Sequence, residues 1–188
     1  MASGLLAYFT ACLSGMILQV LIVYQGWIKL IAKRSLKAFW KVASEPALYA
    51  FGVNSSLATL PITLGALNRL KVSERSARLS ACIGTNFNND GILLYEVVAI
   101  FFLLQAYGIP LNLGQQFLVS AICVIATIGV AGVPEAGIIS LTLVLSAVGL
   151  PQEILPMLLT VDWFLARARS TTNALGDITV AIALDATQ

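Results

Sequence analysis

Four polar residues line one face of the last apolar segment of the sequence, about residues 152–184. If this segment is an α-helix, with 100° per residue, Asp162, Arg169, Asn173 and Asp177 project into a sector of about 80°. An arginine guanidinium can bind a carboxylate ligand through two parallel hydrogen bonds, and carboxylate and amide oxygens suit an alkali cation. The spacing therefore predicts a site for a small anion beside a site for Na⁺. The alternative is a structural network in which Asp162, Arg169 and Asp177 neutralise one another.

A second polar stretch, Thr85-Asn-Phe-Asn-Asn-Asp-Gly91, interrupts another apolar segment. An asparagine is followed four residues later by an aspartate in both segments, at Asn86/Asp90 and Asn173/Asp177. Asn88 and Asp90 add hard oxygen ligands to the predicted cation site. Asp90 as a simple buried capping residue is the alternative.

The composition indicates which kind of protein carries these residues. Of the 188 residues, 59% are hydrophobic and only 20 are charged, and the mean hydropathy is +0.90. Because a soluble domain carries roughly 25% charged residues, we expect a multi-pass, all-α membrane protein with about five or six crossings. The sequence has no histidine, which excludes Ser-His-Asp catalysis and histidine-ligated zinc, and its three cysteines are predicted to be small core residues.

The positions of the basic residues predict how the chain enters the membrane. An uncharged run over 5–28 is long enough to form one full transmembrane helix, and basic clusters follow it at 29–41 and 69–78. The positive-inside rule places both clusters in the cytoplasm, at the inner (plasma) membrane if the source is bacterial. The segment 42–68 must then return to its side of entry. It breaks at residues 52–56 into halves of about ten residues, each half a bilayer long, which predicts a re-entrant helical hairpin; one kinked span is the alternative.

A second hairpin is predicted over residues 111–148. Its break at 129–137 contains three glycines and one proline, and its flanks carry no basic residue, so we expect it to enter from the opposite face. Each hairpin precedes an apolar helix interrupted by polar residues. The sequence therefore predicts an inverted repeat of a re-entrant hairpin plus a broken transmembrane helix, which is typical of secondary transporters.

At these positions the chain resembles the dicarboxylate/amino acid:cation symporters, the family of the glutamate transporters. The matching stretches are Asn54-Ser-Ser-Leu-Ala-Thr-Leu-Pro61, Asn88-Asn-Asp-Gly91 with Tyr95, residues 129–137, and Asp162-Trp-Phe-Leu-Ala-Arg-Ala-Arg-Ser-Thr-Thr-Asn-Ala-Leu-Gly-Asp177. The resemblance implies that residues 1–188 form the substrate-carrying transport domain, the carboxy-terminal half of such a transporter. That domain moves like an elevator against a scaffold half, absent here, that forms a homotrimer at full length.

The resemblance also implies site residues, position by position. The sodium ligands would be Gly84, Asn88, Asn173 and Asp177 in one site, Asn88 and Asp90 in a second, and Asn86 with the backbone of Thr127, Ile128 and Val130 in a third. The substrate shell would be Ser55, Ser56, Val133, Gly137, Asp162, Arg167, Arg169, Ser170 and Asn173. Arg167 is included because animal members carry an arginine at its position. The resemblance also favours coupling to sodium over coupling to protons, because position 177 is an aspartate.

Several positions depart from the family pattern. Ala166 replaces the aspartate that usually pairs with a substrate ammonium, and Ile92 replaces a threonine. Asn89 replaces a methionine, Asn54 replaces the hairpin arginine of many prokaryotic members, and Glu135 places a charge on the tip of the second hairpin. Since a buried ammonium without a partner is costly, a dicarboxylate fits this chain better than aspartate or glutamate.

We therefore expect a sodium-coupled symporter of an acidic small molecule rather than an enzyme, with the lipid bilayer as its environment, no organic cofactor and no nucleic acid partner. A first alternative is a non-transporting fragment, or a subunit that needs a separate scaffold chain. A remote alternative is an intramembrane aspartyl protease that uses Asp90 and Asp177 as its catalytic pair.

Overall fold

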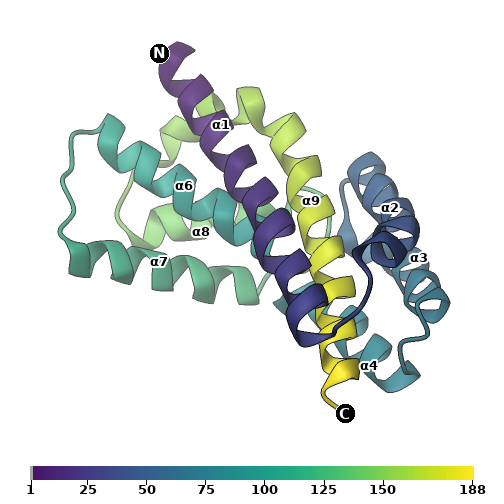
Figure 1. The fold of residues 1–188 in the computed structure, drawn as a ribbon. Coiled ribbons are helices and arrows are strands. Elements are labelled where there is room, and N and C mark those ends of the chain that lie inside the picture. Colours follow the sequence, from purple (N-terminus) through teal and green to yellow (C-terminus); the bar gives the residue numbers. More distant parts are fainter. Residues whose placement is uncertain (1) are drawn as a thin grey trace.

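The computed structural model describes residues 2–188, and all the regular structure in that range is helical (Figure 1). The elements, in chain order, are α1 (Ala2–Leu18), η1 (Gln19–Tyr24), η2 (Trp27–Ile31), α2 (Leu36–Val53), α3 (Ser56–Arg69), α4 (Glu74–Arg78), η3 (Leu79–Ile83), α5 (Gly84–Phe87), α6 (Asp90–Ala106), α7 (Leu113–Ile128), α8 (Ala136–Ala147), η4 (Gln152–Ile154) and α9 (Leu155–Ala186). The segments η1, η2 and η3 are π-helical, and η4 is a 3₁₀ turn.

Helices α2 and α3 form the first predicted hairpin. Asn54 ends α2 in the left-handed conformation (φ 53°), and the Ser55 side chain accepts a hydrogen bond from the N–H of Ala58 to begin α3. The arms are 18 and 14 residues long, so the expectation of about ten residues each was wrong. The reason is that Ser35 caps α2 inside the basic stretch, where its side chain accepts from the N–H of Ala38 and starts the helix early.

Helices α7 and α8 form the second predicted hairpin. Asn112 begins α7 with a capping box shared with Gln115, and non-helical backbone from Gly129 to Glu135 separates α7 from α8. Glu135 holds a left-handed backbone (φ 62°) before α8. This break was correctly predicted because Gly and Pro act on the local backbone.

Only one of the two predicted broken helices is broken. Asn88 and Asn89 lie outside helical geometry between α5 and α6, as expected. In contrast, α9 is a continuous helix of 32 residues that carries Asp162, Arg169 and Asp177 without interruption. Its polar side chains lie on one face, where Asp162 and Arg169 pair with each other and Asn173 and Asp177 bond residues of the α5–α6 region, and its backbone stays helical throughout.

Helix α9 passes through the middle of the molecule and joins two hydrophobic cores. Its first part packs with α1, α6, α7 and α8 around Tyr95, Leu141 and Leu165. Its second part packs with α2, α3 and α4 around Phe39, Leu67 and Ile178. Figure 1 shows the two groups of helices on either side of α1 and α9. The polar residues of α9 lie where the two cores meet.

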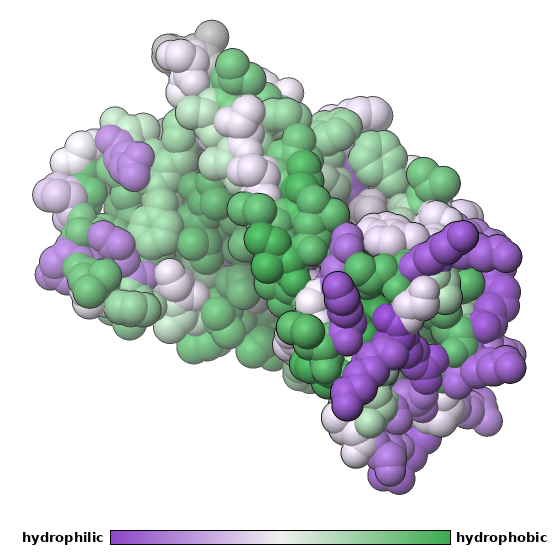
Figure 2. Space-filling view, viewed as in Figure 1, coloured by the Kyte–Doolittle hydropathy of each residue, from purple (hydrophilic) through white to green (hydrophobic). Residues whose placement is uncertain are grey.

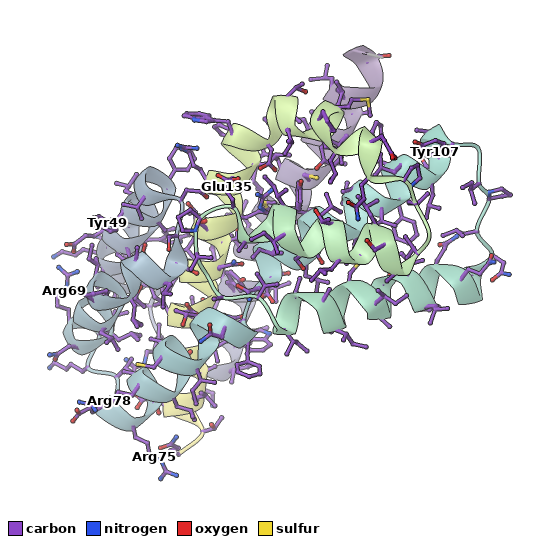
Figure 3. All side chains as sticks on the ribbon, turned by 180° about the vertical axis from the view of Figure 1, so that it is seen from behind. Tyr49, Arg69, Arg75, Arg78, Tyr107 and Glu135 are labelled. Carbon is purple, nitrogen blue, oxygen red and sulfur yellow. The ribbon has the colours of Figure 1, made fainter. Side chains whose placement is uncertain are left out.

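Both basic clusters lie at one end of the molecule. Arg34, from the first cluster, donates to the carbonyl of Leu70 (2.6 Å) and pairs with Asp185 (2.7 Å), whose other oxygen accepts from the N–H of Ser73 (2.9 Å). Figure 2 shows hydrophilic residues gathered at this end, and Figure 3 shows Arg75 at this end and Tyr107 at the other. The expectation that the chain returns to its side of entry between the clusters agrees with this arrangement.

Among residues 2–188, two helical stretches are long and apolar enough to cross a membrane: Ser3–Ile31, and Glu74–Ala106, which includes the break at Asn88 and Asn89. Large apolar side chains such as Leu30, Phe117 and Ile125 are exposed on the outer surface, which suits contact with lipid. Cys12 and Cys123 are buried as predicted, whereas Cys82 is exposed, because it lies on the outer face of η3.

Candidate functional site

The tips of the two hairpins touch each other and the α5–α6 break. The Ser55 hydroxyl donates to the carbonyl of Gly132 (2.7 Å), which also accepts from the N–H of Leu57 (3.1 Å). The N–H of Gly132 donates to the carbonyl of Thr85 (3.1 Å). A Cβ at position 132 would collide with the Ser56 hydroxyl, so this crossing requires glycine. Three segments far apart in the sequence therefore meet at one point beside α9.

A small polar cavity of about 10 Å³ lies at this meeting point. The predicted substrate residues that line it are Ser56, Val133, Gly137, Arg169, Ser170 and Asn173, and they are joined there by Asn54, Ile92, Gly132, Glu135, Ala136 and Ala166. This volume holds roughly one water molecule. A ligand larger than this can enter only if the hairpin tips separate.

Arg169 and Asp162 form a buried ion pair next to the cavity. The guanidinium donates to both carboxylate oxygens, at 2.6 and 3.2 Å, and the two residues are 2% and 3% exposed. The guanidinium carbon also lies 3.9 Å from the centre of the Tyr95 ring. Asp162 thus compensates the charge of Arg169, as the network alternative expected, but Asp177, its third member, bonds Asn88 instead. Two of the five guanidinium N–H donors suffice for this pair, and the others remain for a ligand.

Two of the predicted substrate residues have other roles in this structure. The side chain of Arg167 lies over the exposed ring of Trp163 (3.9 Å) and donates to the carbonyl of Trp163 (2.8 Å), so it lies outside the cavity lining. The Ser55 side chain is used in the contact between the tips and in the cap of α3.

Asp177 lies in the core beside Gly84 and Asn88. Its carboxylate is 1% exposed and accepts one hydrogen bond, from the side-chain amide of Asn88 (3.1 Å). A Cβ on Gly84 would lie 2.6 Å from the same oxygen, so glycine allows the α5 backbone to approach. Within residues 2–188, no Lys or Arg pairs with Asp177. A buried carboxylate with one neutral donor is costly, and a bound cation would offset that cost, so these residues fit Na⁺.

The side chain of Asn173 lines the cavity, as predicted for the substrate shell, and bonds the α5–α6 break rather than Asp177. Its carbonyl oxygen accepts from the N–H of Gly91 (2.8 Å), and its amide donates to the side-chain oxygen of Asn89 (3.2 Å). The structure therefore brings Gly84, Asn88 and Asp177 together but engages the Asn173 side chain with the α5–α6 break.

Asp90 has two partners that sequence reasoning missed. One carboxylate oxygen accepts from the side-chain amide of Gln19 and from the hydroxyl of Tyr24, both at 2.8 Å. The two donors lie five residues apart in η1, and no signal in an uncharged apolar run marks them as polar partners. Asp90 still borders a cavity of about 290 Å³ with Asn88 and Thr179, so it retains space for a cation.

The third predicted sodium position is assembled by the structure but is filled by a side chain. The carbonyls of Asn86, Thr127 and Val130 converge on the side-chain amide nitrogen of Asn89, at 3.2, 3.2 and 2.9 Å, and accept hydrogen bonds from it. Ile128, the other predicted backbone ligand, follows Thr127 in the sequence. These three carbonyl oxygens therefore cannot coordinate a cation while the Asn89 side chain holds this position.

Comparison with known proteins identifies the family. Residues 1–187 match the model of the sodium:dicarboxylate symporter family. The chain belongs to this family. It is 37% identical over 176 residues to excitatory amino acid transporter 1 of Homo sapiens, covering 93% of this chain and 32% of the relative. It is 38% identical over 171 residues to excitatory amino acid transporter 3 of Mus musculus (90% and 33%) and 38% identical over 177 residues to an excitatory amino acid transporter of Caenorhabditis elegans (94% and 35%).

The match confirms the predicted family and decides between two function classes. The family and its relatives are membrane transporters, so the chain is not an enzyme, and the aspartyl protease alternative was wrong. An aspartyl protease needs two carboxylates that share a proton, whereas Asp90 bonds Gln19 and Tyr24 and Asp177 bonds Asn88. The chain spans about a third of the length of the curated relatives it matches.

Proposed function

We propose that this chain is the substrate-carrying part of a sodium-coupled symporter for an acidic small molecule. The observation that carries the proposal is the pair of opposite charges buried on one face of α9. Arg169 borders a closed polar cavity, and Asp177 has no protein cation beside it in the described range. One charge suits a substrate carboxylate and the other suits Na⁺.

The cavity lining favours a dicarboxylate as the substrate. The wall at Ala166 and Ile92 is apolar, so it offers no acceptor for an ammonium group. The relatives are named excitatory amino acid transporters, which makes an acidic amino acid the second candidate. In that case Glu135, which also borders the cavity, is the carboxylate available to pair with the ammonium.

Substrate binding requires movement of the hairpin tips. The contact between Ser55 and Gly132 closes the cavity, and we propose that the α7–α8 hairpin opens by breaking it. We further propose that both hairpins are re-entrant, that the basic end faces the cytoplasm, and that residues 1–188 move as an elevator domain against a scaffold in a homotrimer. The alternative is that this chain acts only together with a separate scaffold chain.

The first prediction concerns sodium binding at Asp177. In the purified chain, NaCl should raise the thermal midpoint relative to choline chloride, because a ligand bound only by the folded state stabilises it by about 2.7 kcal/mol at a hundred times its Kd. Asp177→Asn should abolish this sodium-dependent shift. The matched control is Asp185→Asn, which removes the ion pair with Arg34 about two turns farther along α9, at its C-terminal end, and should leave the sodium shift intact. An unchanged shift in Asp177→Asn would contradict the proposal.

Substrate choice is tested by transport. When this chain is joined to the scaffold half of the transporter, proteoliposomes with an inward sodium gradient should accumulate labelled succinate or malate, and Arg169→Ala should abolish this uptake. The 188-residue chain alone should not transport. If aspartate outcompetes the dicarboxylates, the substrate is an acidic amino acid and the argument from Ala166 is wrong.

A further inference from the structure

The carbonyls at the end of α7 can bind a further partner. The carbonyl of Thr127 accepts a long backbone hydrogen bond from the N–H of Val130 (3.4 Å), but a carbonyl has two lone pairs. The last carbonyls of an α-helix have no intrahelical donor and carry the negative end of the helix dipole. Thr127 and Val130 lie at this end, Thr127 is 4% exposed, and the carbonyl of Asn86 comes close to both. Either a cation or a set of N–H donors can stabilise such a cluster.

Asn89 supplies the donors here, and its orientation is fixed by backbone groups at both ends of a chain of hydrogen bonds. The N–H of Gly91 can only donate, so it fixes the oxygen of the Asn173 side chain toward itself. The amide of Asn173 then donates to the oxygen of Asn89. The amide of Asn89 must therefore face the carbonyls, which can only accept.

The Asn89 side chain is also placed so that it leaves no room for an ion. It is 3% exposed, and its amide nitrogen is 2.9 Å from the carbonyl oxygen of Val130, the ordinary length of a hydrogen bond. Both ends of its amide group have partners. A cation could reach the carbonyls only if Asn89 left them and lost these bonds.

We propose that the side-chain amide of Asn89 replaces a coupling cation at the end of α7, so that the chain closes this end of the α7–α8 hairpin without sodium there. This inference rests on the proposed function, because it reduces the coupling sites implied by the family pattern from three to two. It also assigns Asn89 as the residue that links the hairpin to α9, through Asn173.

The experiment is hydrogen–deuterium exchange of the segment 129–135 in the purified chain, in NaCl and in choline chloride. All variants carry Asp177→Asn, so that sodium at Asp177 does not contribute. With Asn89 present, exchange in this segment should be the same in both salts. Asn89→Leu has a similar volume but no donor, and it should speed exchange roughly tenfold in both salts, which corresponds to the loss of about 1.4 kcal/mol.

Asn89→Asp provides the decisive comparison, because a carboxylate among three carbonyls requires a cation. In this variant NaCl should slow exchange of the segment roughly tenfold relative to choline chloride. The matched controls are Asn68→Leu and Asn68→Asp, on the exposed surface at the end of α3, and they should behave like the parent chain. If Asn89→Leu does not fold, the aspartate variant and the parent chain still decide the question.

Two outcomes would overturn the inference. One is a sodium response of the 129–135 segment in the parent chain as large as in Asn89→Asp, and the other is unchanged exchange in a folded Asn89→Leu chain. Failure of the proposed function has a different signature. With Asp177 intact, sodium would then leave exchange of residues 84–88 unchanged, whereas Asn89→Leu would still loosen the 129–135 segment.

Discussion

At the scale of single residues, the site depends on close approaches that only glycine allows. A Cβ on Gly137 would lie 2.9 Å from Nε and 3.1 Å from Cζ of Arg169, so the α8 backbone forms one wall of the guanidinium site. A Cβ on Gly91 would lie 2.5 Å from the backbone oxygen of Arg169, so α6 packs directly against the α9 backbone. These glycines allow α6 and α8 to approach Arg169 more closely than any residue with a Cβ would.

Gly137→Ala should displace the guanidinium of Arg169 from Asp162. Overpacking of this kind costs about 1–3 kcal/mol of unfolding free energy, and binding of a dicarboxylate should weaken together with stability. The measurements are chemical denaturation in detergent and succinate binding in NaCl. Gly65→Ala is the control, because position 65 lies in α3 with open space around it, and alanine there should stabilise the helix by about 0.5–1 kcal/mol. Equal effects of the two substitutions would contradict the role given to Gly137.

At the scale of elements, the π-helical segment η1 decides which side chains meet Asp90. In an α-helix, residues five apart point about 140° away from each other. In a π-helix the backbone hydrogen bond joins residues five apart, which stacks them on one face. Gln19 and Tyr24 are five apart at the two ends of η1, and both reach the same oxygen of Asp90.

Tyr24→Phe and Gln19→Leu should each destabilise the chain, because each leaves Asp90 with one donor fewer. A hydrogen bond to a charged group contributes about 1.5–3 kcal/mol, and the two effects should not add, because the donors share one carboxylate oxygen. Unfolding free energies of the two single variants and the double variant measure this coupling. Tyr49→Phe, on the exposed face of α2, should change little. Strict additivity would show that the two donors act independently.

At the scale of the whole molecule, the two hydrophobic cores lie side by side, and the loops attached to one core lie at the opposite end from the loops attached to the other. The core of α2, α3 and α4 carries both basic clusters, and the core of α6, α7 and α8 carries the uncharged loops near Tyr107 and Leu150. The hairpin tips meet between these cores, at the middle of α9. This arrangement fits two hairpins that enter a membrane from opposite faces and meet near its centre.

Labelling of single-cysteine variants with a membrane-impermeant maleimide tests this topology. In a chain with Cys82→Ser, Arg75→Cys should react from the cytoplasmic face and Tyr107→Cys from the outer face. Gly52→Cys, on the exposed face of α2 next to the tip of the first hairpin, should react slowly from both faces, because in the proposed topology this position faces lipid away from both membrane surfaces. Rapid reaction of position 52 from the outer face would show that α2 and α3 cross the bilayer completely, which would contradict re-entrance.

The sequence by itself determined the local features of this protein. The breaks at Asn54 and at Gly129–Glu135, the interruption at Asn88 and Asn89, and the polar face of α9 were all predicted, because Gly, Pro, Asn and helical spacing act within a few residues. The apolar composition likewise fixed the class of protein, since 59% hydrophobic residues suit a lipid environment.

Only the tertiary structure decided the partner of each polar side chain. Asn89 reaches carbonyls about 40 residues away, Asp90 binds donors in η1, and Asn173 bonds the α5–α6 break instead of the Asp177 site. The continuous course of α9 was also decided there, since its polar side chains find partners on the same helix, as in the Asp162–Arg169 pair, or on distant segments, as Asn173 and Asp177 do. A hydrogen bond depends on a few ångströms of three-dimensional position, and spacing along one segment does not contain that information.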